Sequence, residues 1–288
     1  MKEVMNMMLE SEMENLHEEP YTAVTTSIQS ADLSPTLCKL CGTSSAFFGN
    51  TEILKKYNVR YFRCQKCGFI QTEQPFWLEE AYSSAIASQD VGIMRRNLIN
   101  LEVTSAILNL LYPKVSRAVD FGAGHGVLVR LMRDRGFNFF WSDLHAKNDY
   151  ARGFECPENA TFDFLTAFEV LEHLVDPISE LSRLMSLSDN VFVSTCTVPQ
   201  PTPGLSEWWY FSPTSGQHIS FYTVESLQLL ATRFSRSLLS IGPYHLFSKK
   251  PKSSFLYRMA TNFRIARIVN LAHRRPGLTE RDFQQMTS

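Results

Sequence analysis

Four of the six cysteines stand in two closely spaced pairs, Cys38 with Cys41 and Cys64 with Cys67, and each pair is followed directly by glycine. The spacing lets each pair lie on a tight turn whose strain the glycine relieves, so that four thiolates can converge as a tetrahedron. Such a set leaves no coordination position open, and we therefore predict a structural zinc ion, not a catalytic one. Ordinary buried thiols and a redox pair are the alternatives, but neither pair sits at the strand-to-helix turn of a βαβ unit.

A second chemically suggestive segment is the glycine-rich run of residues 120–126, between an expected strand and an expected helix. Small residues there let the backbone turn sharply and approach a ligand at the helix N-terminus. The dinucleotide pattern G-x-G-x-x-G would need glycine at position 127, which is valine, and no Gly-Lys-Ser/Thr of a P-loop follows. Asp143, at the end of the next expected strand, is placed to accept hydrogen bonds from ribose hydroxyls. A turn without a ligand is the alternative.

The elements that must position these residues alternate between strand and helix. Expected strands cover residues 117–121, 137–142, 162–168, 191–197, 238–241 and 244–248. Expected helices cover residues 127–135, a segment opening at Asp176-Pro177, and a segment capped by Thr223. A further helical pattern precedes them between about 76 and 111. The alternation predicts an α/β fold, doubly wound, with a mostly parallel sheet that binds ligands at the carboxyl ends of its strands.

Residues 95–250 resemble the class I S-adenosylmethionine-dependent methyltransferases, in their small-molecule branch. The resemblance rests on the glycine loop, on Asp143, and on the run Glu169-Val-Leu-Glu-His173 that follows an expected strand. It implies a seven-stranded Rossmann-like sheet and S-adenosylmethionine as the methyl donor. By this resemblance Asp120, Gly122 and Gly124 hold the methionine part of the cofactor. The full set of cofactor-binding residues that it implies is Asp120, Gly122, Ala123, Gly124, Gly126, Asp143 for the ribose, Leu144, Phe154 for the adenine, and Glu169, which closes the site.

The histidines after the expected strands are the candidates for catalysis. The sulfonium already activates the methyl group, so the enzyme mainly aligns an acceptor, and a general base helps when that acceptor is a hydroxyl or an acidic carbon. We predict His218 as the base with Tyr222 as its orienting partner, and His173 as a residue that positions or tunes the site. Structural hydrogen bonding is the alternative for both histidines. The aromatic run 208–211 could equally stack on a sugar or plug its loop.

A four-cysteine ribbon in front of such a domain is similar to the sugar methyltransferases of antibiotic and surface-polysaccharide pathways. This resemblance implies a small-molecule acceptor, a hydroxyl or carbon of a glycan or nucleotide-linked sugar. The members that methylate carbon carry a further large C-terminal domain, whereas here residues 251–288 are expected to form a basic helical tail. Two alternatives stay open: an RNA or protein methyltransferase in which ribbon and tail grip the polymer, and a non-catalytic scaffold that binds S-adenosylmethionine.

Composition and charge set the remaining expectations. The chain has 288 residues, 44% of them hydrophobic, which is enough for a packed core, and its net charge of −1 gives no general affinity for nucleic acid. No apolar stretch is long enough to span a membrane and no secretory signal is recognisable, so a cytoplasmic protein is expected; no feature indicates an oligomeric state. The expected organisation is a flexible acidic lead-in (1–32), a zinc ribbon (33–75), the methyltransferase domain (76–250) and the basic tail (251–288).

Overall fold

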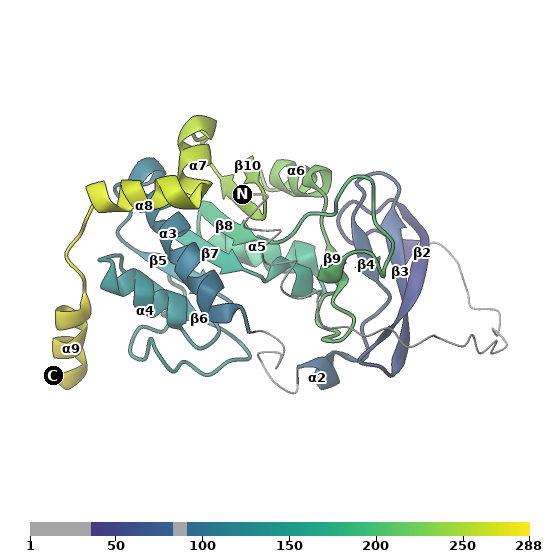
Figure 1. Ribbon diagram of the computed structural model, residues 1–288, viewed down its shortest axis with the longest axis horizontal. Coiled ribbons are helices and arrows are strands. Elements are labelled where there is room, and N and C mark those ends of the chain that lie inside the picture. The colour runs from purple at the N-terminus through teal and green to yellow at the C-terminus, as the bar shows by residue number, and fades with distance from the viewer. Residues whose placement is uncertain (1–35, 83–90) are drawn as a thin grey trace. The chain divides into compact units, whose positions relative to one another are not determined.

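The computed structural model describes residues 36–82 and 91–288, so the acidic lead-in expected for residues 1–32 lies outside the described part. Residues 35–288 belong to one structural unit, whose described residues form two β-sheets with helices (Figure 1). Within the described residues, every helix is too short or too polar to cross a membrane.

The larger sheet has six strands in the order β10-β11-β8-β7-β5-β6. Its parallel strands are β5 (Ala118–Phe121), β6 (Phe139–Ser142), β7 (Phe164–Phe168) and β8 (Asn190–Ser194). The antiparallel hairpin of β10 (Ser237–Ile241) and β11 (Tyr244–Ser248) completes the sheet beside β8. The central strands are short, mainly apolar runs that are buried on both faces, as is typical of a parallel sheet between two helical layers.

The predicted α/β sheet is present, but the seventh strand implied by the resemblance is not seen among the described residues. Beyond β6, pairing is limited to one parallel bridge between Trp141 and Glu155. The neighbouring segment turns repeatedly, with positive φ angles of 83° at Gly153 and 56° at Asn159. Such angles interrupt an extended backbone, which explains why no regular strand follows.

Helices cover both faces of this sheet. Because successive residues of a strand point to opposite faces, Leu165 of β7 packs in one hydrophobic cluster and Phe164 in the other. The Leu165 side is covered by α5 (Pro177–Leu187) and α6 (Val224–Arg233). The Phe164 side is covered by α3 (Ile93–Leu111), α4 (Val127–Asp134), α7 (Ser254–Thr261) and α8 (Phe263–Ala272). The sheet is therefore doubly wound, as predicted.

Two helix starts agree with their sequence signals. The Asp176 side chain accepts a hydrogen bond from the Ser179 N–H at 3.1 Å, and Pro177 follows at the first helical position of α5. At the start of α6, Thr223 and Ser226 cap each other reciprocally. Both helices thus begin directly after segments that carry candidate site residues.

The cysteine pairs belong to a second, antiparallel sheet in the order β1-β2-β3-β4-β9. Its strands are β1 (Thr36–Leu37), β2 (Ser44–Ile53), β3 (Tyr57–Cys64), β4 (Ile70–Thr72) and β9 (Ser220–Phe221). The last strand comes from the segment between β8 and α6, and Ile70 pairs directly with Phe221 (Figure 1). A segment that precedes the strands of the larger sheet and a segment between its strands β8 and β10 are therefore joined in one sheet.

This sheet shares its hydrophobic core with the larger one. Cys38, Cys64 and Phe69 belong to the same buried cluster as Leu165 and Leu230. A further cluster joins the ribbon strands to the aromatic run 208–211, whose short 3-10 helix η2 (Trp209–Phe211) packs on Tyr61 and Phe221. Only Trp209 of this run is exposed, at 60%, so the run mainly fills the core.

The expected C-terminal tail is helical, and it packs onto the domain. Tyr257 of α7 and Val269 of α8 are buried against α3 and the sheet. The last helix, α9 (Thr279–Thr287), is held by Asp282, which forms a bidentate ion pair with Arg133 of α4 at 2.6 and 2.8 Å. The negative charge of Asp282 in the tail is thus neutralised by an arginine of the domain.

Candidate active site

The glycine loop lies at the carboxyl end of β5 and leads into α4. Gly122, Gly124 and Gly126 have positive φ angles of 71°, 53° and 87°, a region that side-chain-bearing residues rarely adopt. A Cβ atom at Gly122 would lie 2.6 Å from Val170, and one at Gly126 would lie 2.9 Å from Asn148. At Gly124 it would meet no atom of the described residues within 4 Å. The loop therefore exposes its backbone at Gly124, where a ligand can approach closely.

Asp143 holds this loop from the end of β6. Its carboxylate accepts hydrogen bonds from the N–H groups of Gly124 at 2.8 Å, His145 at 2.7 Å and Ala146 at 2.8 Å. A carboxylate has about four acceptor positions, so about one remains for a ligand hydroxyl. Asp143 thus fixes the loop and keeps about one acceptor position, whereas from the sequence we expected it to accept both hydroxyls of a ribose.

Two further carboxylates lie at the ends of the neighbouring strands. Asp120 is buried and accepts a hydrogen bond from Thr166 at 2.6 Å. Glu169 follows β7 with a strained φ of 52° and accepts a hydrogen bond from Ser194 at 2.6 Å. Burial raises the pKa of each to about 7, and the nearby Asp143 and Glu172, respectively, add to this effect. A cationic ligand would favour their charged forms.

The remaining predicted cofactor residues, Ala123, Leu144 and Phe154, differ in how far they are exposed to solvent. Ala123 is partly buried between the glycines, and Leu144 is 70% exposed beside Asp143. Phe154 is buried, and the guanidinium of Arg133 lies 3.6 Å from the centre of its ring. One face of that ring is therefore already covered, and the structure does not support stacking of adenine on Phe154.

The two predicted catalytic histidines lie together. His173 ends the 3-10 helix η1 (Leu171–His173) and His218 lies just before β9, and their ring centres are 4.9 Å apart. The Nδ1 of His173 is 3.0 Å from the carbonyl of Gln217, and the Nδ1 of His218 is 2.7 Å from the carbonyl of Tyr210. Since a carbonyl only accepts, each Nδ1 donates and each Nε2 keeps its lone pair. Burial lowers the pKa of both imidazoles to about 4, so both are neutral.

Tyr222 does not orient His218, contrary to our expectation. Its side chain is fully buried, its ring packs on Phe69 at 5.0 Å, and its hydroxyl donates to the carbonyl of Leu171. Residue 222 lies one position beyond β9, and the alternation along this segment turns it into the core under α6. The main chain of Tyr210 takes the orienting position instead.

Sequence reasoning missed two residues of this site. Tyr82 places its hydroxyl 2.9 Å from Nδ1 of His173 and stacks its ring on His145, so it links the histidine pair to the Asp143 loop. Glu172 is fully buried beside the pair and accepts a hydrogen bond from Tyr210 at 2.6 Å. Tyr82 carries no recognisable signal, but Glu172 belongs to the Glu-Val-Leu-Glu-His run and could have been singled out.

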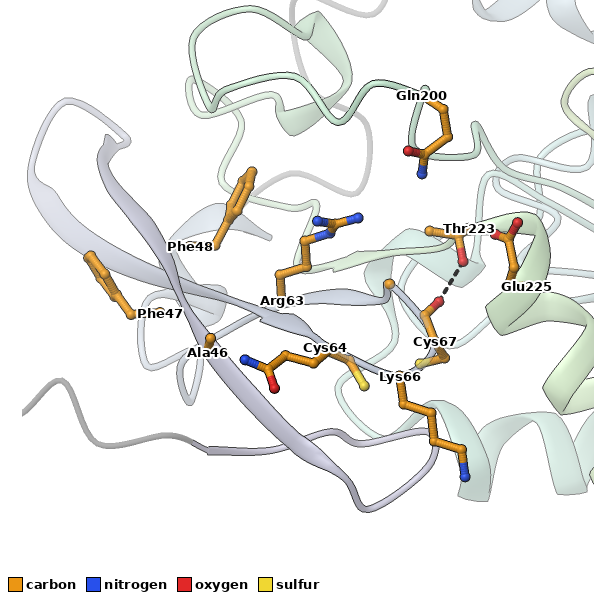
Figure 2. A pocket seen from close by; sticks show the side chains of 12 residues that line it. Ala46, Phe47, Phe48, Arg63, Cys64, Lys66, Cys67, Gln200, Thr223 and Glu225 are labelled. Atoms are coloured by element: carbon orange, nitrogen blue, oxygen red, sulfur yellow. Dashed lines mark hydrogen bonds between the residues drawn. The ribbon is translucent and has the colours of Figure 1, made fainter.

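The cysteines converge on one point, as predicted. The sulfur atoms of Cys38 and Cys67 are 3.7 Å apart, and those of Cys41 and Cys64 are 3.4 Å apart. Both pairs form the same turn: the glycine after each pair donates to the carbonyl of the first cysteine and has a φ of 70°. The carbonyl of Cys67 accepts from the hydroxyl of Thr223, which ties this cluster to the start of α6 (Figure 2).

A hollow of about 450 Å³ lies against the cysteine cluster. In Figure 2 the side chains of Arg63 and Gln200 face each other across it, and Glu225 lies on the α6 side. Its lining contains no residue of the glycine loop and neither of the paired histidines. The hollow is therefore distinct from the candidate active site.

The comparisons agree with this geometry. Residues 94–235 match a family described as a methyltransferase domain. The match shows a methyltransferase domain in residues 94–235, and the glycine loop follows the central parallel strand of its sheet. No curated protein matches the sequence.

Several solved structures are similar to the chain. One is an O-methyltransferase family protein from Burkholderia thailandensis, with 15% identity, 59% of this chain and 66% of that chain covered, and a TM-score of 0.42. Another is the plantazolicin methyltransferase BpumL in complex with SAH, with 11% identity, coverage of 68% and 85%, and a TM-score of 0.45. A third is magnesium protoporphyrin IX methyltransferase from Synechocystis, with 13% identity, coverage of 59% and 90%, and a TM-score of 0.38.

Proposed function

We propose that this protein transfers a methyl group from S-adenosylmethionine to a hydroxyl or carbon of a small polar acceptor, a glycan or nucleotide-linked sugar. The observation that carries the cofactor site is the open backbone at Gly124, next to the carboxylate of Asp143. The acceptor class is supported by the resemblance of the ribbon and domain arrangement to sugar methyltransferases.

The loop residues fit the proposed cofactor in shape and charge. Gly124 leaves room for the cofactor backbone, and Asp143 keeps about one acceptor position for a ribose hydroxyl. Asp120 and Glu169 offer negative charge near the strand ends, which favours a positively charged sulfonium. The cofactor supplies the activated methyl group, and the chain's residues bind and orient it.

The histidine pair is the proposed activating group for the acceptor. His218 and His173 both turn an Nε2 lone pair away from their backbone partners. A hydroxyl acceptor must lose its proton as the new O–C bond forms, and an imidazole that is neutral at pH 7 has a free lone pair to accept that proton. The Tyr82 bridge to His145 brings this pair next to the loop that holds Asp143.

We further propose that the four cysteines bind a structural zinc ion. Tetrahedral Zn²⁺ with Zn–S bonds of about 2.3 Å places its sulfurs about 3.8 Å apart. The distances of 3.7 and 3.4 Å between two pairs of sulfurs fit this arrangement closely. The ion would hold together the two turns that anchor the smaller sheet to α6.

Calorimetry with S-adenosylmethionine tests the cofactor site. Gly124→Val places a branched side chain where the cofactor approaches, and affinity should fall by more than about tenfold, or about 1.4 kcal/mol. Gly242→Val is the matched control, because Gly242 also has a positive φ, 56°, and open surroundings but lies in the β10–β11 turn. Equal affinity in both variants would refute the site.

The acceptor is tested separately with S-adenosylmethionine labelled in its methyl group. We expect label in nucleotide-linked sugars or oligosaccharides offered as a panel. Label that appears only in RNA or in protein would overturn the acceptor class and favour the polymer alternative. Binding of S-adenosylmethionine without transfer to any offered acceptor would favour the scaffold alternative.

A further inference from the structure

We propose that Glu172, His173 and His218 bind one divalent transition-metal ion, at a site separate from the four-cysteine cluster, and that this ion binds the acceptor hydroxyl. One ligand atom from each of the three side chains lies within 4.8 Å of the others. The residues come from two segments, η1 and the loop before β9, which are joined by hydrogen bonds from the Ile219 N–H to the carbonyl of Glu172 and from the Tyr222 hydroxyl to the carbonyl of Leu171. The role in catalysis rests on the proposed function, whereas binding of the ion does not.

The hydrogen bonds of the histidines are those of metal ligands. Each Nδ1 donates to a backbone carbonyl, that of Gln217 for His173 and that of Tyr210 for His218. Metal-bound histidines usually donate their other ring N–H in this way, which fixes the tautomer and the direction of the remaining lone pair. One ring nitrogen of each histidine lies within 4.8 Å of the other and of a Glu172 oxygen, so one ion placed between them could be bound by all three residues.

Glu172 supplies an independent indication. Its side chain is fully buried, and its Oε1 accepts the hydroxyl of Tyr210 at 2.6 Å. Its Oε2 is buried with no hydrogen-bond partner among the described residues. An unpaired carboxylate oxygen in the interior is costly, and a cation shared with the two imidazoles would offset that cost.

The donor set selects the kind of ion. Two imidazole nitrogens and one carboxylate oxygen suit Zn²⁺, Mn²⁺, Co²⁺ or Fe²⁺ better than Mg²⁺ or Ca²⁺, which prefer oxygen ligands. Three protein ligands leave at least one coordination position for an acceptor oxygen. Val170, two residues before Glu172, lies so close to Gly122 of the cofactor loop that a Cβ atom there would be 2.6 Å from it, so the segment that carries Glu172 packs against this loop.

With the ion bound, both histidines use their remaining lone pairs as ligands, so they act through the metal and no longer as the direct base proposed above. A hydroxyl bound to a divalent metal releases its proton to solvent more readily, and the resulting alkoxide attacks the methyl carbon. The O–C bond forms as the C–S bond breaks, and the electron pair of that bond goes to sulfur. The products are the methyl ether, S-adenosylhomocysteine and one proton.

Manganese binding to the full-length protein tests the inference. Mn²⁺ is a suitable probe because it prefers nitrogen and oxygen ligands to thiolates, so it reports on this site and not on the cysteines. Electron paramagnetic resonance should show one bound Mn²⁺ per chain, with affinity reduced by at least about tenfold in His173→Ala, His218→Ala and Glu172→Gln. His273→Ala is the control, since His273 lies at the exposed end of α8, and it should bind Mn²⁺ like the natural protein.

A measurement on the natural protein avoids reliance on variants that fold poorly. Pulsed electron paramagnetic resonance should detect two histidine nitrogens coupled to the bound Mn²⁺. Absence of bound Mn²⁺, or binding without histidine coupling, would overturn the site. Calorimetry with S-adenosylmethionine on the same samples separates the two proposals: cofactor binding without Mn²⁺ binding removes only the metal site, and the reverse removes only the cofactor site.

Discussion

At the scale of single residues, the candidate site depends on groups that serve both structure and chemistry. Asp143 uses about three of its four acceptor positions to hold backbone N–H groups, and each histidine uses one ring nitrogen to hold its orientation. What is left at each residue is a single directed lone pair. A substitution at one of these positions removes a structural hydrogen bond together with the remaining lone pair. Its effect on ligand binding or turnover can therefore be interpreted only beside a control variant that loses a comparable structural hydrogen bond elsewhere.

Asp143→Ala should weaken binding of S-adenosylmethionine, because both the ribose acceptor and the support of the loop are lost. A hydrogen bond to a charged group contributes about 1.5–3 kcal/mol, so at least about a tenfold loss of affinity is expected by calorimetry. Asp163→Ala is a matched control: Asp163 also accepts bonds from two backbone N–H groups and a hydroxyl, but it precedes β7. A similar loss in both variants would show that general destabilisation of the fold, and not the loss of a ribose acceptor, lowers the affinity.

His218→Ala should lower turnover by about 100-fold or more while cofactor affinity stays nearly intact, because we propose that this residue activates the acceptor and does not contact the cofactor. Burial lowers the pKa of His218 and His173 to about 4, so neither imidazole gains a proton between pH 8 and pH 5. The pH profile of kcat/KM should therefore show no decline that belongs to an imidazole near pH 6.5. A decline there that disappears in His218→Ala would contradict the assignment.

At the scale of elements, the smaller sheet and the methyltransferase sheet stabilise each other. β9 pairs with β4, the hydroxyl of Thr223 at the start of α6 binds the carbonyl of Cys67, and a Cβ atom at Gly68 would clash with Thr223 at 2.9 Å. The loop with His218 is held between β9 and η2. The ribbon thus positions the histidine side of the candidate site from outside the large sheet.

Removal of zinc should for this reason affect both sheets. Metal analysis should find one zinc ion per chain in the natural protein and none when Cys64→Ser is combined with Cys67→Ser. The double substitution should also lower Tm and weaken cofactor binding, because the cysteines share a core with α6. Cys156→Ser, outside the cluster, should retain the ion and the Tm. Cofactor binding that survives complete zinc loss unchanged would show that the two parts fold independently.

At the scale of the whole molecule, the C-terminal helices complete the face of the sheet opposite α5 and α6. The bidentate pair of Asp282 and Arg133 is buried, with side chains 4% and 3% exposed. Arg133 also donates to Asn138 and to the carbonyl of Phe139, and its guanidinium covers Phe154. Attachment of α9 therefore determines how Arg133 and Phe154 pack below the glycine loop.

Asp282→Asn should lower the free energy of unfolding by about 3 kcal/mol, since it leaves a buried guanidinium without its counter-charge. Although burial opposes it, hydrogen bonding by Arg133 and Arg130 keeps the pKa of Asp282 below its usual value. The contribution is therefore complete above about pH 4 and is lost as the pH falls through the lowered pKa. Glu280→Gln, at an exposed position of α9, is the control and should unfold like the natural protein in urea at pH 7.

The sequence by itself determined the features that short stretches of chain encode. The spacing of the cysteines and the glycine after each pair predicted the convergence of the four sulfurs. Asp176-Pro177 and Thr223 predicted helix starts, and the glycine run predicted the open loop, because caps and left-handed turns depend on a few neighbouring residues. The alternation of apolar strands and helices predicted the doubly wound sheet, because the period of each element is also read from a short stretch of sequence.

Only the tertiary structure decided what surrounds these features. It brought Glu172 and His173 against His218, more than forty positions away, and turned Tyr222 into the core. It joined the ribbon to the large sheet through β9 and reduced the expected seventh strand to a single bridge. Such contacts depend on burial between segments far apart in the chain, and no local period or spacing records which residues will meet there.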